Sequence, residues 1–182
     1  MADILFLAHR IPYPPNKGDK IRSWHVLAHL SERHRVHLGC FIDDPADRTH
    51  RAYLAARAKM KSLPGLLTGA PLSLGYYGSR AMRRWVAATL AAHPVGAIVA
   101  VCSSMAPYAL PHAGKGNGNG KGMVTLIDFI DVDSEKWRQY AAAGRWPLSA
   151  IYGREARRLL AFERHAAAAC DQGFFVSEAE AA

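Results

Sequence analysis

The chain has 182 residues, and 23 Lys and Arg against 15 Asp and Glu give it a formal net charge of +8. Hydrophobic residues make up 50% of it, which excludes an intrinsically disordered protein, and no apolar run approaches the ~18 residues of a membrane-spanning helix. The first ten residues do not form a signal peptide. We therefore expect one cytoplasmic domain over residues 1–182, with an anionic partner: nucleic acid, a phosphorylated small molecule or an acidic membrane surface.

The first half of the chain predicts two strands, each followed by a helix. Residues 4–8 form a short apolar run that ends in a Pro-rich loop, which is typical of a buried strand before a turn. Asp19 can cap a helix that continues to about residue 33, and residues 36–42 form a second strand. A polar helix rich in Ala and Arg follows over residues 45–61.

The second half continues this alternation. We expect a weak strand at 72–76, a helix at 79–92 and the clearest buried strand at 97–102. The remaining elements are, in order, a short helical turn at 105–110, a low-complexity insertion at 114–122, a strand at 123–127, a long helix at 147–169, a strand at 173–176 and a last helix capped by Ser177.

Alternation of continuously apolar strands with helices implies a parallel sheet covered on both faces. About six such strands predict a Rossmann-like, doubly wound α/β domain. Because ligands bind such sheets at the carboxyl ends of the strands, we expect the site in the loops that follow them, at 9–19, 43–47, 102–107, 128–134 and from 177 onward.

The loop after the first strand combines cations with a helix amino terminus. Backbone N–H groups at such a terminus, together with neighbouring cations, suit a phosphate or a diphosphate. The alternative is a rigid Pro-rich connector whose charges are solvated. The residues expected to bind substrate are Lys17, Gly18, Asp19, Lys20 and Arg22 in this loop, and Ser103 and Ser104 after the strand at 97–102.

Aspartates follow the strand at 123–127. Asp128 and Asp131 are the candidate catalytic residues, because carboxylates at a strand end can orient sugar hydroxyls, bind a metal or act as a base. Asp133 and Ser134 have a plainer interpretation as caps of the next helix.

Aromatic and cationic residues interleave around the start of the helix at 79–92. Such a mixture suits an acidic membrane surface, where rings lie at the headgroups and arginines meet phosphates. The alternative is that Trp85 belongs to the core side of an ordinary helix. The residues expected to contact a membrane are Tyr76, Tyr77, Arg80, Arg83, Arg84 and Trp85.

Cysteines and histidines do not predict a metal site. Cys40 and Cys102 lie in apolar runs typical of buried thiols. His25 and His29 share a helix face, but no third ligand accompanies them. No G-x-G-x-x-G follows the first strand, so a dinucleotide is not expected either. We predict neither a metal nor another cofactor.

Two glutamates, Glu155 and Glu163, are separated by seven residues in the long helix. The arginines that interleave with them predict ion pairs on a solvated face.

Two segments carry a family resemblance: LFLAHRIPYPPNKGDKIRSWHVLAHL near the amino end, and DFIDVDSEKWRQYA. With them, nearly the whole chain resembles the amino-terminal half of family 4 glycosyltransferases of the GT-B fold, similar to the sugar transferases of PEP-CTERM/exosortase exopolysaccharide systems. The closing FFVSEAEAA resembles the strand after which such enzymes continue to their interdomain linker. Gly18 matches one glycine of the family's Gly-Gly pair, Lys17 replaces the other, and Asp128 stands where relatives often have His.

The resemblance implies an acceptor-side Rossmann-like domain whose carboxyl-terminal donor-binding domain is absent from this chain. The family's E-x7-E motif belongs to that second domain, so Glu155 and Glu163 match it by chance. The implied reaction is retaining transfer of a hexose from a nucleotide-sugar to a lipid- or polysaccharide-linked acceptor in exopolysaccharide biosynthesis, and the chain alone is expected to be inactive. The alternative is a non-enzymatic basic domain that binds anions or nucleic acid; it lacks an evident stacking motif, so we predict no nucleic-acid partner.

Overall fold

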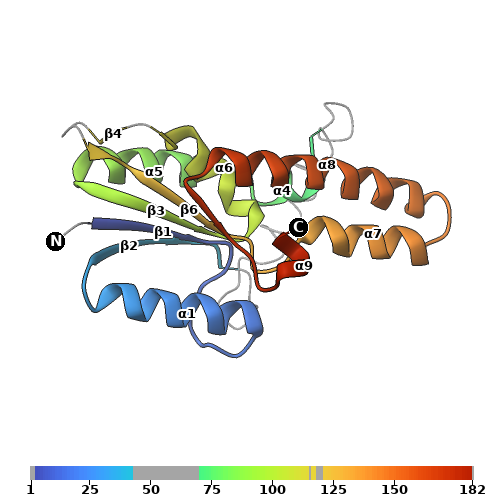
Figure 1. Ribbon diagram of the computed structural model, residues 1–182, viewed down its shortest axis with the longest axis horizontal. Helices are drawn as coiled ribbons and strands as arrows, with labels where there is room; N and C mark the ends of the chain where they lie inside the picture. Colours follow the sequence, from blue (N-terminus) through green and yellow to red (C-terminus); the bar gives the residue numbers. More distant parts are fainter. Residues whose placement is uncertain (1–2, 43–69, 115, 118–120, 182) are drawn as a thin grey trace.

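The computed structural model describes residues 3–42, 70–114, 116–117 and 121–181 (Figure 1). At its centre is a five-stranded sheet in the order β2-β1-β3-β6-β7, in which all neighbouring strands are parallel. The expected Rossmann-like α/β fold is thereby confirmed. The strands are β1 (Asp3–Ala8), β2 (Arg35–Cys40), β3 (Val95–Val101), β6 (Val124–Asp128) and β7 (Gln172–Phe174).

Helices cover both faces of the sheet (Figure 1). Side chains alternate across a strand, so Ile4 and Phe6 of β1 pack against the helix α1 (Gly18–Ser31) on one face. Leu5 and Leu7 pack into the layer on the other face. That layer contains α5 (Arg80–Ala92), α6 (Ala106–Ala109) and α8 (Leu148–Ala169). Burial on both faces explains why β1 is a continuous apolar run.

The chain reverses its direction of winding between β1 and β3. It goes from β1 to the edge strand β2 and then returns to β3 on the other side of β1. The connections that leave β1 and β3 therefore run to opposite faces of the sheet. This divergence opens a crevice at the carboxyl ends of these two strands, which is the usual ligand position in doubly wound folds.

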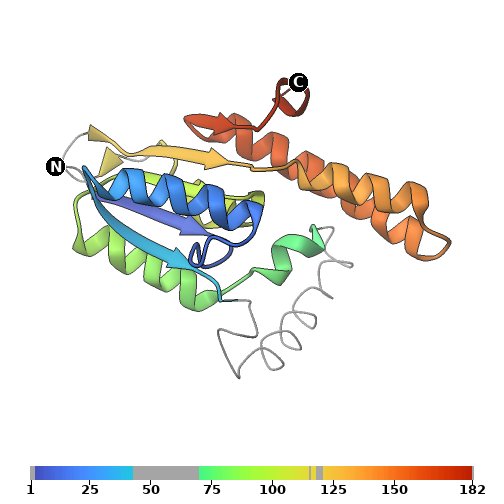
Figure 2. The same ribbon diagram turned by 90° about the horizontal axis from the view of Figure 1, so that it is seen from below.

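A helical hairpin of α7 (Asp133–Ala143) and α8 extends beyond the sheet (Figures 1 and 2). Trp137 on α7 and Tyr152 on α8 hold the pair together, with ring centroids 5.5 Å apart. The shorter elements are α4 (Leu72–Tyr76), η2 (Ser103–Met105), η3 (Leu110–His112), β4 (Gly116–Asn117), β5 (Lys121–Gly122) and α9 (Glu178–Ala181).

Two sequence-based expectations about elements need correction. Residues 72–76 form the helix α4 and not a strand, so the sheet has five strands where about six were expected. The helix α7 at 133–143 was not among the expected elements, although Asp133 and Ser134 were considered as caps of a helix that follows them. The expected polar helix at 45–61 and the candidate loop at 43–47 lie outside the described residues.

Candidate functional site

A cavity of about 580 Å³ opens at the carboxyl ends of β1, β3 and β6. Its wall mixes charged, hydroxyl and aromatic side chains with backbone from three loops. The lining residues are His9, Arg10, Gly18, Asp19, Ser73, Tyr77, Cys102, Ser103, Ser104, Phe129, Ile130, Asp131, Asp133, Lys136 and Trp137. The cavity thus occupies the crevice between β1 and β3, where the topology favours a ligand.

Strained backbone lies on this wall. Cys102, directly after β3, has φ 78°, and Ile130, shortly after β6, has φ 61°. Side chains with a Cβ rarely adopt this region, and β-branched residues such as isoleucine hardly ever do. Within the described ranges, no other residue besides glycine has a positive φ. Strain of this kind persists at functional sites, where the surrounding structure holds it in place.

The carboxylate of Asp133 connects β3 to α7 across the cavity wall. It accepts hydrogen bonds from the Ser103 hydroxyl at 3.2 Å and from the Cys102 thiol at 3.4 Å. Lys136 Nζ bridges two of the acidic residues of the wall, at 3.3 Å from Asp133 and 2.7 Å from Asp131. Asp133 is therefore not the expected helix cap: α7 begins without a side-chain cap, after Val132.

These contacts set the charges on the wall. Partial burial by itself lowers the pKa of Lys136, but Asp131 and Asp133 outweigh it, and the pKa is raised. Burial, with the nearby Asp133 carboxylate, raises the pKa of Cys102 to about 11. Cys102 is thus a neutral thiol at physiological pH and not a nucleophile.

His9, at the end of β1, pairs with Asp19 on the first turn of α1. Its Nε2 lies 3.1 Å from the Asp19 carboxylate, which also accepts a hydrogen bond from Arg10 at 3.1 Å. Burial lowers the pKa of His9 although Asp19 opposes the shift. Burial alone raises the pKa of Asp19, but His9 and Arg10 outweigh it, so that this pKa is lowered. The pair therefore consists of a neutral imidazole and a carboxylate at neutral pH.

The tautomer of His9 follows from this pairing. A carboxylate can only accept a hydrogen bond, so in the neutral ring Nε2 carries the proton and donates it to Asp19. Nδ1 then carries a lone pair, and it has no hydrogen-bond partner among the described residues. A neutral imidazole oriented by a carboxylate is the usual arrangement of a general base.

Glu155 anchors the short helix α4 beside the cavity, and Glu163 is buried near the start of α7. Both side chains are buried, at 1% and 5% exposure, so the expected solvated ion pairs are wrong. Glu155 accepts hydrogen bonds from the backbone N–H groups of Leu72 and Ser73, at 2.8 and 2.9 Å, and so caps α4. Glu163 is buried near Ser134 at the amino end of α7, where burial raises its pKa, and neither of its carboxylate oxygens has a hydrogen-bond partner among the described residues. Carboxylates are favoured at helix amino ends because they complement the helix dipole and the free N–H groups.

The expected substrate-binding residues separate into two groups. Gly18, Asp19, Ser103 and Ser104 line the cavity, as does the candidate catalytic Asp131. The other four lie elsewhere: Lys17 is exposed at the start of α1, Lys20 is buried without a hydrogen-bond partner for its Nζ in the described part of the chain, and Arg22 and Asp128 pair with each other.

Asp128 is held by this pair at the end of β6. Its Oδ2 accepts from Arg22 Nε at 2.6 Å and its Oδ1 from the Ile130 backbone N–H at 3.1 Å. It is buried and is not among the residues that line the cavity, so its observed contacts are structural. The catalytic role of Asp128 stays a prediction that these contacts do not support.

The residues expected at a membrane lie around the start of α5. Arg80, Arg83 and Arg84 are exposed and line a shallow depression there, and Tyr76 is 44% exposed. Tyr77 instead lines the cavity. Trp85 is 37% exposed, and its ring lies over Gly39 of β2, where an added Cβ would be 2.5 Å from Cζ3. In the described ranges, no helix combines the length and apolar character that crossing a membrane requires.

Several wall residues were not singled out from the sequence. His9 and Arg10 lie in the first candidate loop, but only their neighbours further along it were chosen. Lys136 and Trp137 lie one turn into the helix α7 that was not predicted. An i, i+3 acid–lysine spacing at Asp133 and Lys136 is the sequence signal that could have found this helix.

No protein-family model matches the chain, and no curated protein matches it either.

Proposed function

We propose that this chain is the amino-terminal, acceptor-binding domain of a glycosyltransferase that acts in exopolysaccharide biosynthesis. The complete enzyme would transfer a sugar from a nucleotide-sugar to a lipid- or polysaccharide-linked acceptor, in the cytoplasm or at the inner face of the membrane. The observation that carries the proposal is the cavity at the carboxyl ends of β1, β3 and β6. The sequence resemblance to the acceptor half of GT-B enzymes supports it.

The chemistry of the wall suits a hydroxyl-rich acceptor. Asp131 and Asp133 offer carboxylate oxygens to sugar hydroxyls, and Trp137 offers an aromatic face on which a sugar ring can stack. Arg10 and Gly18 are the wall residues that suit an acceptor or donor phosphate, since Gly18 is the first residue of α1. Acidic side chains on this wall do not favour the alternative of a nucleic-acid-binding domain.

His9 is the base we propose for the acceptor hydroxyl. Its Nδ1 is buried in this structure, so binding of the acceptor must expose it. Nδ1 then takes the hydroxyl proton as the acceptor oxygen bonds to the anomeric carbon and the nucleoside diphosphate leaves, and Asp19 stabilises the imidazolium that forms. Direct displacement by a base-activated hydroxyl inverts the anomeric configuration, so this role for His9 departs from the retention that the sequence resemblance implies and predicts an inverted product. In an enzyme completed by a donor-binding domain, His9→Gln is expected to lower kcat by about 10²- to 10⁴-fold with little effect on KM. Full activity of that variant, together with a retained product, would remove His9 from the mechanism.

Acceptor binding can be tested on the chain alone. Titration with oligosaccharide acceptor mimics, followed by NMR, is expected to shift signals of the cavity wall, and Trp137→Ala and Asp133→Asn should each weaken binding about tenfold. Trp146→Ala is the matched control, because Trp146 is 83% exposed in the turn that joins α7 to α8. Binding of duplex DNA with a steep salt dependence would favour the alternative, and robust turnover of a nucleotide-sugar by this chain alone would contradict the division between two domains.

We also propose that the start of α5 contacts an anionic membrane. Arg80, Arg83 and Arg84 lie together, and no acidic side chain of the described residues forms an ion pair with them. Replacing all three by Gln should abolish co-sedimentation with phosphatidylglycerol vesicles at low salt. Replacing Arg157, Arg158 and Arg164 on α8 by Gln removes the same charge and should leave it intact. Equal loss of co-sedimentation in both variants would show that vesicle binding depends only on the net charge of the chain.

A further inference from the structure

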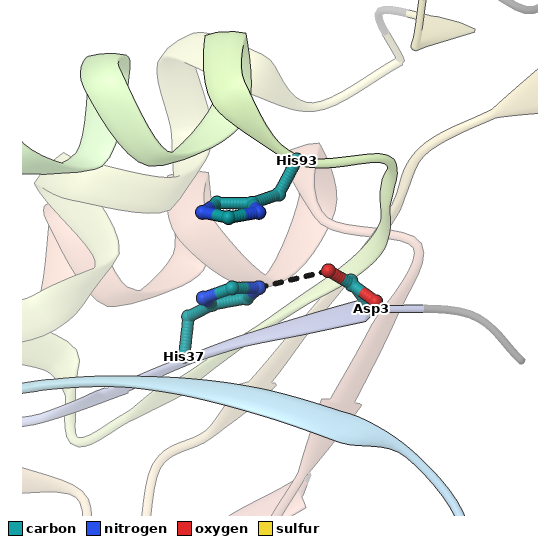
Figure 3. A group of neighbouring side chains, drawn as sticks. All are labelled: Asp3, His37 and His93. Carbon is teal, nitrogen blue, oxygen red and sulfur yellow. Dashed lines mark hydrogen bonds and ion pairs between the residues drawn. The ribbon is translucent and has the colours of Figure 1, made fainter.

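At the amino end of the sheet, opposite the cavity, three metal-capable side chains meet (Figure 3). Asp3 is the first residue of β1, His37 lies in β2, and His93 follows the last residue of α5. One ligand atom from each lies within 4.8 Å of the other two. Among the described residues, no other three His, Cys, Asp or Glu side chains come together in this way.

Topology brings these three residues together. Parallel pairing sets Asp3 of β1 beside Arg35 of β2, so that His37, two residues further along, lies on the same face of the sheet. That face is the one covered by α5, whose carboxyl end delivers His93. Three elements that are far apart in the sequence therefore supply one donor each.

The donors are already close to coordination geometry. His37 Nε2 lies 2.9 Å from Asp3 Oδ2. Two zinc bonds of about 2.0–2.1 Å at a tetrahedral angle place their ligand atoms about 3.3 Å apart. Only a small opening of the Asp3–His37 contact is then needed for a metal to replace the proton between them.

His93 needs the larger adjustment. Its ring stacks on that of His37, with centroids 4.2 Å apart and planes 31° from parallel (Figure 3). Stacked rings direct their nitrogen lone pairs side by side, so the His93 ring must rotate to aim one at the metal. His93 is half-buried and directly follows the last residue of α5.

The surroundings of the two stacked histidine rings favour binding of a cation. Asp3 is buried at 4% exposure and lies beside the stacked imidazoles, where it accepts a hydrogen bond from His37. Arg35, at 3.9 Å from Asp3, is the competing cation, but its side chain is 69% exposed and free to turn to solvent.

We propose that Asp3, His37 and His93 form a binding site for Zn²⁺. Two imidazole nitrogens and one carboxylate oxygen are the donors that zinc accepts, and three protein ligands leave a fourth position for water. The metal would tie β1, β2 and the end of α5 together. This site is independent of the proposed function of the cavity.

Zinc titration of the untagged chain against a chromogenic chelator tests the proposal. The wild-type chain is expected to bind one Zn²⁺ and to melt at a higher temperature with it. His93→Ala should weaken binding at least tenfold, and Asp3→Asn, which still accepts a hydrogen bond from His37, should do the same. His25→Ala is the control, because His25 is exposed on α1.

Cobalt supplies a second readout. Four-coordinate Co²⁺ absorbs visible light strongly, and this band should appear with the wild-type chain and disappear in His93→Ala. Circular dichroism of each metal-free variant checks that it is folded. Absence of zinc binding by the wild-type chain, or unchanged affinity in folded His93→Ala, would overturn the proposal.

Discussion

At the carboxyl end of the sheet, the side chains of the cavity wall come from loops and helix starts, whereas at the amino end Asp3 and His37 project from regular strands. The loop-built end contains the two strained residues and several helix anchors. The strand-built end depends on pairing register and on the end of α5, which supplies His93. The difference teaches that the cavity needs supporting interactions from outside the sheet, while the histidine cluster needs none beyond the sheet and the end of α5.

Removing an anchor should produce the largest effect. Glu155→Ala leaves the N–H groups of Leu72 and Ser73 without their acceptor and is expected to lower the free energy of unfolding by about 3 kcal/mol, measured by urea denaturation. The exposed Glu135→Ala should cost less than about 0.5 kcal/mol. Zinc binding should survive in Glu155→Ala, and its loss would show that the two ends of the sheet are coupled.

Backbone strain at the carboxyl end of the sheet can be tested by replacing two cysteines, one at a time, with glycine. Cys102→Gly relieves a positive φ and is expected to raise the free energy of unfolding by about 1 kcal/mol, after the loss of thiol burial is counted. Cys40→Gly, in the regular strand β2, should lower it by about 1 kcal/mol. Changes of the same sign in thermal melting would mean that the backbone at Cys102 stores no strain.

Stability should depend on pH through His9. Its folded-state pKa lies below the ordinary 6.5, so the unfolded chain binds the proton more readily and stability falls as the pH drops below 6.5. The groups that face it are Asp19, Arg10 and Asp133. His9→Gln should flatten the change in denaturation midpoint between about pH 7.5 and pH 5.5. An equally steep profile in the variant would contradict the burial of a neutral imidazole.

The smallest effect is expected at the mouth of the cavity. An added Cβ at Gly18 meets nothing within 4 Å, so Gly18→Ala should change the free energy of unfolding by no more than about 0.5 kcal/mol. Gly39→Ala, within the sheet, drives a Cβ against the Trp85 ring at 2.5 Å and should cost about 1–3 kcal/mol. Thermal melting of the two variants gives the comparison directly, and equal losses would contradict the open position of Gly18.

The fold was largely predictable because the buried strands are continuous apolar runs. β1 and β3 were located to within two residues, and the helices α1 and α5 were expected close to their observed bounds, although Asp19 does not cap α1, which begins after Lys17 without a side-chain cap. Residues 72–76 misled because their apolar character suits a strand, whereas a carboxylate from Glu155 in the distant α8 caps them as a helix. Because Glu155 is far from residues 72–76 in the sequence, no pattern within those residues indicates that they form a helix.

The position of the candidate site could be predicted from the sequence, but the set of residues that line it could not. Topology placed the crevice at the loops after β1, β3 and β6, and five of the nine candidate catalytic and substrate-binding residues line it. Asp128 and Arg22 were both chosen, yet they pair with each other, because strand parity turns Asp128 toward α1. The cluster at Asp3, His37 and His93 was missed, since its three members belong to separate elements without motif spacing.

The two buried glutamates Glu155 and Glu163 lie at a fixed spacing on one helix, α8. Glu155 accepts hydrogen bonds at the start of α4, Glu163 lies buried near Ser134 at the start of α7, and the eight steps between them span about 12 Å along the axis. The rise of α8, which does not itself line the cavity, therefore fixes the spacing of these two carboxylates. Inserting a single residue between Glu155 and Glu163 would rotate one of them about the helix axis by about 100° relative to the other. That glutamate would leave its place beside the cavity, although every residue that lines the cavity would be unchanged.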